Sequence, residues 1–211
     1  MATYHHVEFT KLKELVALVM QKNNISAEDS AMVADVLLTS DLFGIESHGV
    51  QRLSMYLTGM DLGRINRDAQ WKIVKETPLS AVIDADAGMG QPVSVRAMRM
   101  AIDKAKKSGF GMVVVNNSNH YGIAGYYSMM AAKEGLYGMS MTNTEGLVVP
   151  IYGKSPMLGT NPIAYSMPAD PTILHMDVST SVVTAGKMEV CAKANKPLPD
   201  GWSVDSDGKV N

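Results

Sequence analysis

The sequence is short of the residues that build disulfide-bonded and nucleic-acid-binding proteins. It has one cysteine, Cys191, among 211 residues, which excludes a disulfide within the chain and fits a reducing compartment. Its 19 Lys and Arg are balanced by 21 Asp and Glu, and the basic residues form no cluster. Nucleic acids and anionic lipids bind concentrated positive charge, so neither is expected as the main partner. We expect a cytoplasmic protein, for which a small anionic metabolite remains a candidate ligand.

Long apolar runs are also missing. No stretch of about 18 apolar residues occurs, and the first residues lack a basic region followed by an apolar core. A membrane span and a secretion signal are therefore not expected. Apolar residues still make up 46% of the chain, which is enough to bury the core of one large or two small domains.

Two segments resemble nucleotide-binding motifs but lack residues that those motifs require. In Gly88-Met89-Gly90-Gln91-Pro92-Val93 the third glycine of a Rossmann fingerprint is replaced by Val93, and no strand ends in an acidic residue about 20 positions later. Gly153-Lys154-Ser155 lacks the earlier glycine of a P-loop, because Val148 stands there. No Cys/His or carboxylate cluster has zinc-like spacing, so no metal site is expected.

The first third of the sequence has the pattern of consecutive helices. Apolar residues recur at helical spacing over 10–22, 26–44 and 47–60. Each stretch begins with a hydroxyl residue that we expect to be its N-cap: Thr10, Ser26 and Ser47. These stretches predict a helical domain of residues 1–70.

The remainder, residues 71–211, has a mixed pattern. Strands are predicted at 71–75, 79–84, 111–115, 137–142, 163–167 and 173–178, and helices at 92–107, 124–134 and 180–194. The nearly all-apolar run at 111–115 predicts a strand buried on both faces. Residues 202–209 have the pattern of a strand entering a turn, with no room for a returning strand. The fold class is therefore α/β (α+β), with a second domain over 71–211.

Three polar residues lie beside the apolar stripe of the third predicted helix. His48, Arg52 and Tyr56 are spaced by four positions, which puts them on one helical face. A guanidinium matches a carboxylate, and an imidazole can donate a proton to a nascent alkoxide near neutral pH. Together they suit the reduction of a 2-oxo acid. An ordinary solvated helix face is the alternative, and spacing alone favours it.

His120 lies in a loop directly after the predicted strand at 111–115. Its neighbours are mostly Asn, Gly and Ser, in the segment Asn116-Asn117-Ser118-Asn119-His120-Tyr121-Gly122. Loops after strands commonly carry functional residues. The pattern leaves two interpretations equally open, a proton-transferring histidine or a loop histidine that satisfies backbone carbonyls.

Four ordered motifs resemble the malate/L-lactate dehydrogenase family that includes ureidoglycolate dehydrogenase and 2,3-diketogulonate reductase. They are Asp41-Leu42-Phe43-Gly44-Ile45-Glu46-Ser47-His48-Gly49, Asn119-His120-Tyr121-Gly122, Leu158-Gly159-Thr160-Asn161-Pro162 and Met176-Asp177-Val178-Ser179-Thr180-Ser181-Val182-Val183. The resemblance covers essentially the whole chain. It implies a helical domain packed on a mixed, non-Rossmann sheet that binds NAD or NADP, in a homodimer.

The resemblance also implies roles for individual residues. His120 is the proton-transfer residue and His48 a second proton donor, while Ser47, Arg52 and Tyr56 surround a small carboxylate substrate. The implied cofactor-binding residues are Thr144, Gly159, Thr160, Asn161, Asp177, Val178, Ser179 and Thr180. The implied reaction is hydride transfer between NAD(P)(H) and a small 2-hydroxy or 2-oxo acid.

The sequence departs from the family pattern in its length. Members continue further, with a Lys-Gly segment and additional helices, so we expect this chain to be a truncated product or a fragment. Two alternatives to the enzyme follow. One is an inactive fragment that retains a dimerisation surface. The other is an anion-binding module in which His48 and Arg52 recognise a ligand without chemistry.

Overall fold

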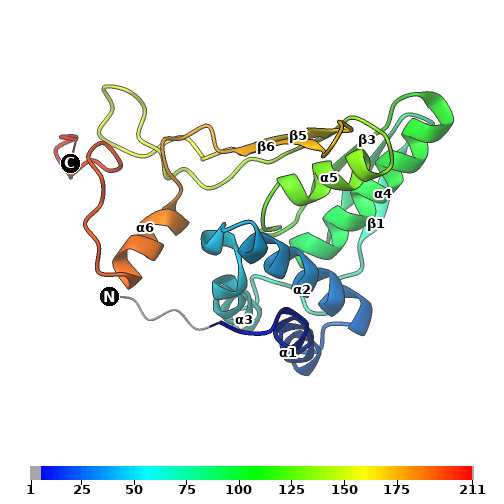
Figure 1. Ribbon diagram of the computed structural model, residues 1–211, viewed down its shortest axis with the longest axis horizontal. Coiled ribbons are helices and arrows are strands. Elements are labelled where there is room, and N and C mark those ends of the chain that lie inside the picture. The colour runs from blue at the N-terminus through cyan, green and yellow to red at the C-terminus, as the bar shows by residue number, and fades with distance from the viewer. Residues whose placement is uncertain (1–5, 211) are drawn as a thin grey trace.

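Three helices from the start of the chain form one layer of the molecule. In the computed structural model, which describes residues 6–210, α1 (Phe9–Lys22) packs against α2 (Ala27–Leu42), and α3 (Leu53–Asp61) completes the layer (Figure 1). The buried side chains that they share are Val16, Met20, Val33, Ala34, Leu37, Tyr56 and Met60. Each large side chain buried in this way stabilises the fold by roughly 1.5–3 kcal/mol.

The N-cap of α2 is the predicted residue, whereas the N-cap of α1 is not. Ser26 caps α2 as predicted, and its hydroxyl accepts a hydrogen bond from the amide of Asp29. For α1 the prediction of Thr10 is wrong, because the cap is Glu8, whose carboxylate accepts from the amides of Thr10 and Lys11. The longer side chain of Glu8 reaches both amides, and Thr10 lies inside the first turn.

The predicted continuous helix over 47–60 is wrong in its first half. Two 3-10 turns, η1 (Glu46–His48) and η2 (Val50–Arg52), precede α3 and are separated by Gly49. The carboxylate of Asp41 accepts a hydrogen bond of 2.8 Å from the first amide of η2. A Cβ at position 49 would lie 1.7 Å from an oxygen of that carboxylate. The chain therefore turns around Asp41, which comes from the end of α2.

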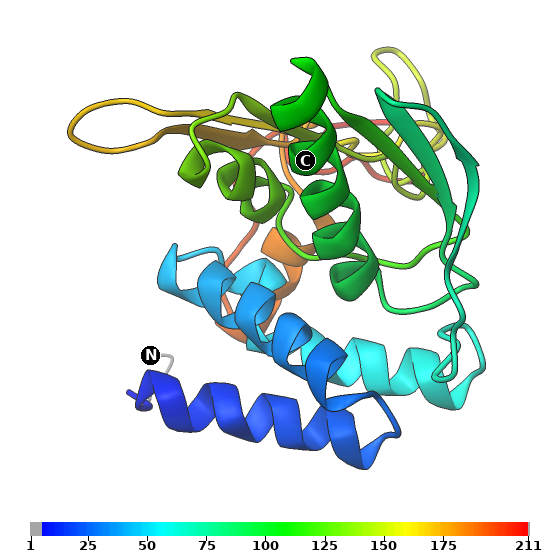
Figure 2. The same cartoon turned by 90° about the vertical axis from the view of Figure 1, so that its right-hand side faces the viewer.

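A three-stranded mixed sheet follows the helical layer. Strand β1 (Lys72–Glu76) runs antiparallel to β2 (Ser80–Asp84), and β2 runs parallel to β3 (Met112–Asn116). The connection between the two parallel strands is α4 (Gly90–Ser108), which packs on one face of the sheet (Figure 2). This crossover brings the loop after β3 next to the start of α4.

Strand β3 is covered on one face only, so the prediction that both faces are buried is wrong. Val113 and Val115 pack with Ile83 against α4. Met112 and Val114 point the other way and are about half exposed, at 51% and 48%. A strand alternates its side chains between two faces, and only one face of this sheet carries a helix in the described residues.

A second sheet lies beyond α5 (Gly125–Lys133). It consists of β4 (Gly138–Met141), β5 (Ile163–Met167) and β6 (Leu174–Val178), in that order and antiparallel throughout. Residues 6–210 thus form a mixed sheet and an antiparallel one beside the helical layer, and the predicted α/β (α+β) fold class is confirmed. Strands β3 and β4 are consecutive in the chain, with α5 between them, but they belong to different sheets and do not pair.

Helix α6 (Ala185–Lys193) is shorter than the predicted helix over 180–194. The hydroxyl of Ser179 donates to the carbonyl of Ser181, whose own hydroxyl donates to the carbonyl of Val183. Such local side-chain bonds compete with helix formation. They keep the residues before α6 in bends, so the helix starts at Ala185.

The chain does return at the end of its described part, contrary to the prediction for 202–209. Val204 and Val210 form an isolated antiparallel bridge, and the amide of Asp205 donates to the carbonyl of Lys209 at 2.9 Å. Gly208, at φ +81°, permits the tight turn that makes this short return.

Candidate functional site

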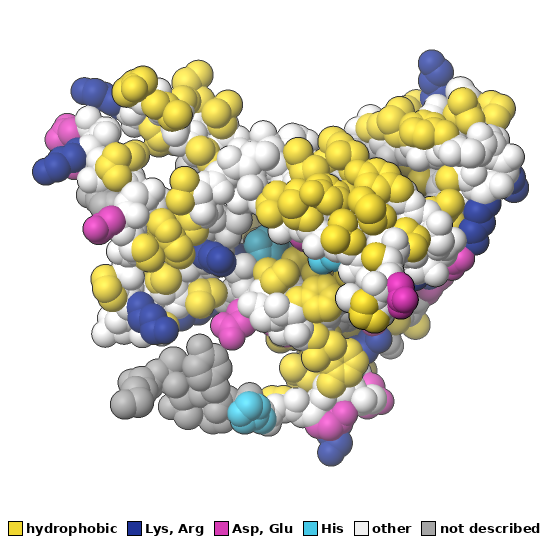
Figure 3. Space-filling view, turned by 45° about the horizontal axis from the view of Figure 1, so that its top comes forward, with side chains coloured by type: hydrophobic (Ala, Val, Ile, Leu, Met, Phe, Trp, Pro, Cys, Tyr) yellow, Lys and Arg dark blue, Asp and Glu magenta, His cyan; other side chains and the backbone are white. Residues whose placement is uncertain are grey.

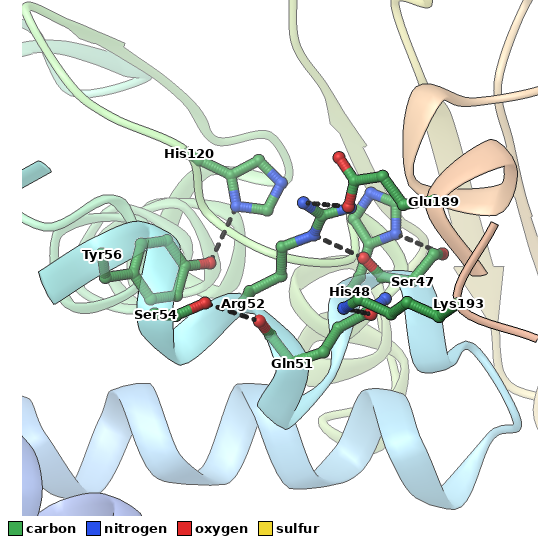
Figure 4. A network of polar contacts seen from close by, with 9 residues as sticks. All are labelled: Ser47, His48, Gln51, Arg52, Ser54, Tyr56, His120, Glu189 and Lys193. Atoms are coloured by element: carbon green, nitrogen blue, oxygen red, sulfur yellow. Dashed lines mark hydrogen bonds and ion pairs between the residues drawn. The ribbon is translucent and has the colours of Figure 1, made fainter. Parts of the chain in front are cut away.

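The two histidines that stand out in the sequence lie face to face. His48 comes from η1 and His120 from the loop after β3, and their ring centroids are 5.5 Å apart at an interplanar angle of 26°. Figure 4 shows both rings and the guanidinium of Arg52 turned toward the same space. The structure thus joins the helical layer to the first sheet at these residues.

The loop that carries His120 is held against the start of α4. The side-chain amide of Asn119 donates to the carbonyls of Ala87 and Gly88, at 2.6 and 3.0 Å. A Cβ at position 90 would lie 2.2 Å from the carbonyl oxygen of Asn119 and 2.6 Å from that of His120. Glycine at position 90 therefore permits the approach that places His120.

Behind His120 lies a buried chain of hydrogen bonds. The hydroxyl of Tyr56 is 2.8 Å from Nδ1 of His120, and Nε2 of Gln91 donates to the same hydroxyl at 2.7 Å. Tyr56 and Gln91 are 1% and 0% exposed, whereas His120 itself is exposed. The imidazole is thus open to a ligand while its inner nitrogen is anchored. Nδ1 contacts the Tyr56 hydroxyl and the amide of Gly122 rather than a backbone carbonyl, unlike the nitrogen of a histidine that satisfies backbone carbonyls.

Arg52 is fixed by two oxygen acceptors. Its Nε donates to the carbonyl of Ser47 at 2.6 Å, and its Nη1 lies 3.0 Å from a carboxylate oxygen of Glu189 on α6. Only 12% of the Arg52 side chain is exposed. A Cβ at Gly186 would come within 2.4 Å of Nη2, so α6 packs directly on this guanidinium. Ser47 is not a helix cap, since its hydroxyl bonds to Nδ1 of His48.

The electrostatics of the site favour neutral imidazoles. The pKa of His48 is lowered to about 4, chiefly by burial and also by the charge of Arg52, while Glu189 opposes the shift. Enclosure by protein likewise lowers the pKa of His120 below its ordinary value, aided by His48 and Arg52. Because His120 is exposed to solvent, water moderates that shift. Burial raises the pKa of Tyr56, so its hydroxyl stays protonated.

Most of the predicted cofactor residues form a second cluster. The hydroxyl of Thr144 accepts from the amide of Thr160 at 2.8 Å, and the amide of Thr144 donates to the side-chain oxygen of Asn161 at 3.1 Å. The amide of Thr180 donates to the carbonyl of Thr160 at 2.8 Å. A Cβ at Gly159 would lie 2.4 Å from the Asn161 oxygen. The two predicted loops are therefore adjacent and present hydroxyl and amide groups.

The remaining predicted cofactor residues have separate places. A carboxylate oxygen of Asp177 accepts from the amide of Gly125 at 2.7 Å, which satisfies the first amide of α5. Val178 is exposed at the end of β6, and the Ser179 hydroxyl is bonded to the carbonyl of Ser181. Asp177 thus links the second sheet to α5.

Sequence reasoning missed two members of the site. Gln91 lies in the segment set aside as a failed dinucleotide motif, and Glu189 lies in a predicted helix without a distinguishing pattern. Both reach the site only through tertiary packing. Within residues 6–210, no group of three or more His, Cys, Asp or Glu is arranged to hold a metal ion.

Comparisons with known proteins identify a family and relatives of the chain. A model of the malate/L-lactate dehydrogenase family matches residues 7–211. Malate dehydrogenase of Pyrococcus abyssi is 47% identical over 207 residues, which cover 98% of this chain and 57% of that protein. Ureidoglycolate dehydrogenase (NAD(+)) of Escherichia coli K12 is 33% identical over 198 residues, 93% of this chain and 57% of that protein.

A solved structure shares the fold. The crystal structure of malate dehydrogenase from Entamoeba histolytica has a TM-score of 0.95 at 38% identity, over 99% of this chain and 58% of that one. The chain therefore spans a little over half the length of the relatives that it matches.

Proposed function

Since the chain belongs to the malate/L-lactate dehydrogenase family, we propose that it transfers a hydride between NAD(H) or NADP(H) and a small 2-hydroxy or 2-oxo acid. The observation that carries the proposal is the largely buried guanidinium of Arg52 beside the facing imidazoles of His48 and His120. A fixed cation next to a proton-transfer group suits a carboxylate whose neighbouring carbon bears the reacting oxygen. Malate dehydrogenase and ureidoglycolate dehydrogenase among the relatives support this substrate class.

In this proposal Arg52 binds the substrate carboxylate. Its planar fork offers two parallel N–H donors, and the carbonyl of Ser47 fixes the orientation of that fork. Tyr56 lies behind His120 and acts through it. Ser47, whose hydroxyl holds His48, completes the substrate-binding set.

His120 is the proposed proton-transfer residue, with His48 as a second donor. His120 is exposed on the side open to a ligand and anchored on the other. A substrate carboxylate beside Arg52 adds a negative charge near both imidazoles, which favours their protonated forms. In reduction the protonated imidazole of His120 gives its Nε2 proton to the 2-oxo oxygen, which leaves a lone pair on Nε2; in oxidation this lone pair takes the proton back.

The cofactor is proposed to lie along the cluster of Thr144, Gly159, Thr160 and Asn161. Its hydroxyl and amide groups suit the carboxamide and ribose hydroxyls of a nicotinamide nucleotide, and Gly159 permits close backbone approach. When bound, NAD(P)(H) supplies or accepts the hydride. We include Thr180 in the cofactor set because its amide and hydroxyl both donate to Thr160. Asp177, Val178 and Ser179 are proposed to shape the same surface through the end of β6.

We also propose a homodimer of cytoplasmic chains, each with a helical domain over 1–70 and an α/β domain over 71–211. Large apolar side chains gather on the face that carries β5 and β6 (Figure 3). Tyr137 and the β4 residues Met139 and Met141 are 57%, 45% and 58% exposed. Large apolar side chains gathered on a surface are typical of a protein–protein interface. No helix within residues 6–210 has the length and apolarity needed to cross a bilayer.

The test is to mix the purified chain with NADH or NADPH and a panel of 2-oxo acids, and to follow the loss of reduced-cofactor absorbance. Turnover that disappears in His120→Ala supports the proposal and identifies the substrate class. Binding of a 2-oxo acid without turnover, seen by calorimetry, would instead support the anion-binding module. Neither binding nor turnover, with a dimer in solution, would support the inactive fragment.

A further inference from the structure

We propose that Gln91 and Tyr56 are positioning residues that hold His120 in the neutral tautomer with its proton on Nε2. The inference deepens the proposed function, on which only its catalytic consequence rests. It assigns a task to Gln91, a wholly buried polar side chain 29 positions before His120 that no sequence motif marks.

A hydroxyl and a backbone amide converge on Nδ1 of His120. The Tyr56 hydroxyl lies 2.8 Å away, and the backbone amide of Gly122 donates to the same nitrogen at 3.4 Å. A backbone amide can only donate, so Nδ1 must accept. In a neutral imidazole one nitrogen accepts and the other carries the proton, which places the proton of His120 on Nε2.

Gln91 sets the direction of the Tyr56 hydroxyl. Its Nε2 donates to the tyrosine oxygen at 2.7 Å, and a phenol has a single proton to give. With its oxygen accepting from Gln91, the hydroxyl directs that proton to His120. Tyr56 is 1% exposed, so water does not compete for the bond. The Gln91 Oε1 is buried without a partner among the described residues, so Tyr56 is the one bonded partner of this amide there.

The consequence is that the exposed face of His120 presents an N–H group. Such a group donates a hydrogen bond to the oxygen of a 2-oxo acid before any proton moves. Loss of the Gln91 or Tyr56 contact would leave the ring free to adopt the other tautomer, whose lone pair cannot donate to the 2-oxo oxygen in reduction. The wrong tautomer of a catalytic histidine costs up to roughly 10⁴-fold in rate in serine proteases.

The direct test is the tautomer itself, read from ¹⁵N shifts and long-range ¹H–¹⁵N couplings of the full chain labelled in its histidines. Spectra are recorded at about pH 8, above the ordinary pKa of histidine. The signal absent from His120→Asn identifies His120. We expect the pattern with the proton on Nε2. A proton on Nδ1 in the unaltered chain would overturn the inference.

Two variants test the parts played by the neighbours. Tyr56→Phe removes the hydroxyl with little change of shape, and we expect a mixture of the two tautomers. Gln91→Glu replaces the amide donor by a group that can accept from Tyr56, so the phenol proton turns away and the tautomer with the proton on Nδ1 should gain population. Gln70→Glu adds an acid at an exposed glutamine and is the matched control. A tautomer unchanged in both variants would refute the role of Gln91 and Tyr56.

Kinetics separate this inference from the proposed function. In Gln91→Leu we expect kcat for reduction of a 2-oxo acid to fall at least about tenfold with KM nearly unchanged, because positioning of the ring is lost while Arg52 is intact. If the unaltered chain shows the expected tautomer but no turnover, the proposed reaction is refuted, while the positioning role of Gln91 and Tyr56 is still supported. If Gln91→Leu keeps the full kcat, the proposed effect of the tautomer on catalysis is refuted.

Discussion

Glu189 holds Arg52 through an ion pair in which a carboxylate oxygen lies 3.0 Å from Nη1. The partner is a carboxylate, the same chemical group that the proposed substrate would bring to this guanidinium. Glu189 is 49% exposed while Arg52 is 12% exposed, so the pair sits at the border between solvent and protein. Glu189 would therefore compete with the proposed substrate for the guanidinium of Arg52.

Removing this competitor should improve substrate capture. In Glu189→Gln the amide keeps the shape but loses the charge, and we expect KM for a 2-oxo acid to fall about two- to fivefold, the size of a partly exposed ion pair. Steady-state kinetics at constant ionic strength measure it. Glu134→Gln, which removes the remote exposed pair with Lys106, is the control and should leave KM unchanged. A rise in KM would mean that Glu189 helps to bind the substrate.

Shortening the guanidinium should weaken substrate binding more than catalysis. Arg52→Lys keeps a positive charge but loses the planar fork that reaches both Ser47 and Glu189. We expect KM to rise roughly 10- to 100-fold, the loss of one charge-assisted hydrogen bond or more, with a smaller change in kcat. The opposite split, with kcat reduced and KM retained, would reassign Arg52 to the chemical step.

Stability should decrease as the pH falls below neutrality. The pKa of His48 lies at about 4 in the folded chain against about 6.5 when unfolded, so between these values the unfolded state binds more protons. Its contribution is complete above pH 6.5 and is lost toward pH 4. The charged or titratable neighbours are Arg52, Glu189 and His120.

Urea denaturation at about pH 7 and pH 5 measures this effect. We expect the free energy of unfolding to fall by up to roughly 2 kcal/mol on account of His48. In His48→Asn the fall should be smaller by that amount, because the substituted side chain does not titrate. An equal fall in both proteins would show that other groups dominate. The window lies above the ordinary range of aspartate and glutamate, which limits their part.

Glycine at position 90 should be needed for the loop of His120. A methyl group there would lie 2.2 Å from a backbone oxygen, which cannot swing aside as a long side chain can. We expect Gly90→Ala to destabilise the chain by roughly 1–3 kcal/mol, despite the better helix propensity of alanine. Gly146→Ala is the control, since its Cβ would make ordinary contacts of 3.4 Å. Equal unfolding midpoints for both variants would contradict the prediction.

The strands and the long helices could be predicted because periodicity and turn residues are local. The break at Gly49 could not, because it depends on the carboxylate of Asp41, which approaches only after α2 has packed. His48, Arg52 and Tyr56 lie close together as expected, but the reason given for it was wrong. They come from two 3-10 turns and α3, not from one face of a continuous helix.

The residues of the site also differ in whether the sequence alone could identify them. The resemblance of the motifs identified His48 and His120, whose proximity the structure confirms. Gln91 and Glu189 carry no local signal, and they enter the site through α4 and α6, which pack on it from distant parts of the chain. Sequence patterns do not identify such residues, because their contacts with the site form only when distant parts of the chain pack together.

The contacts that close the site also determine when it can form during folding. Tyr56 and His120 are 64 positions apart, and Gln51 meets Lys193 across 142 positions. Closing such long loops costs chain entropy that only later packing repays. The helical layer can collapse on local contacts, but the histidine pair exists only once the β2–α4–β3 crossover has docked. A chain in which this crossover has not docked therefore lacks the contact between His48 and His120.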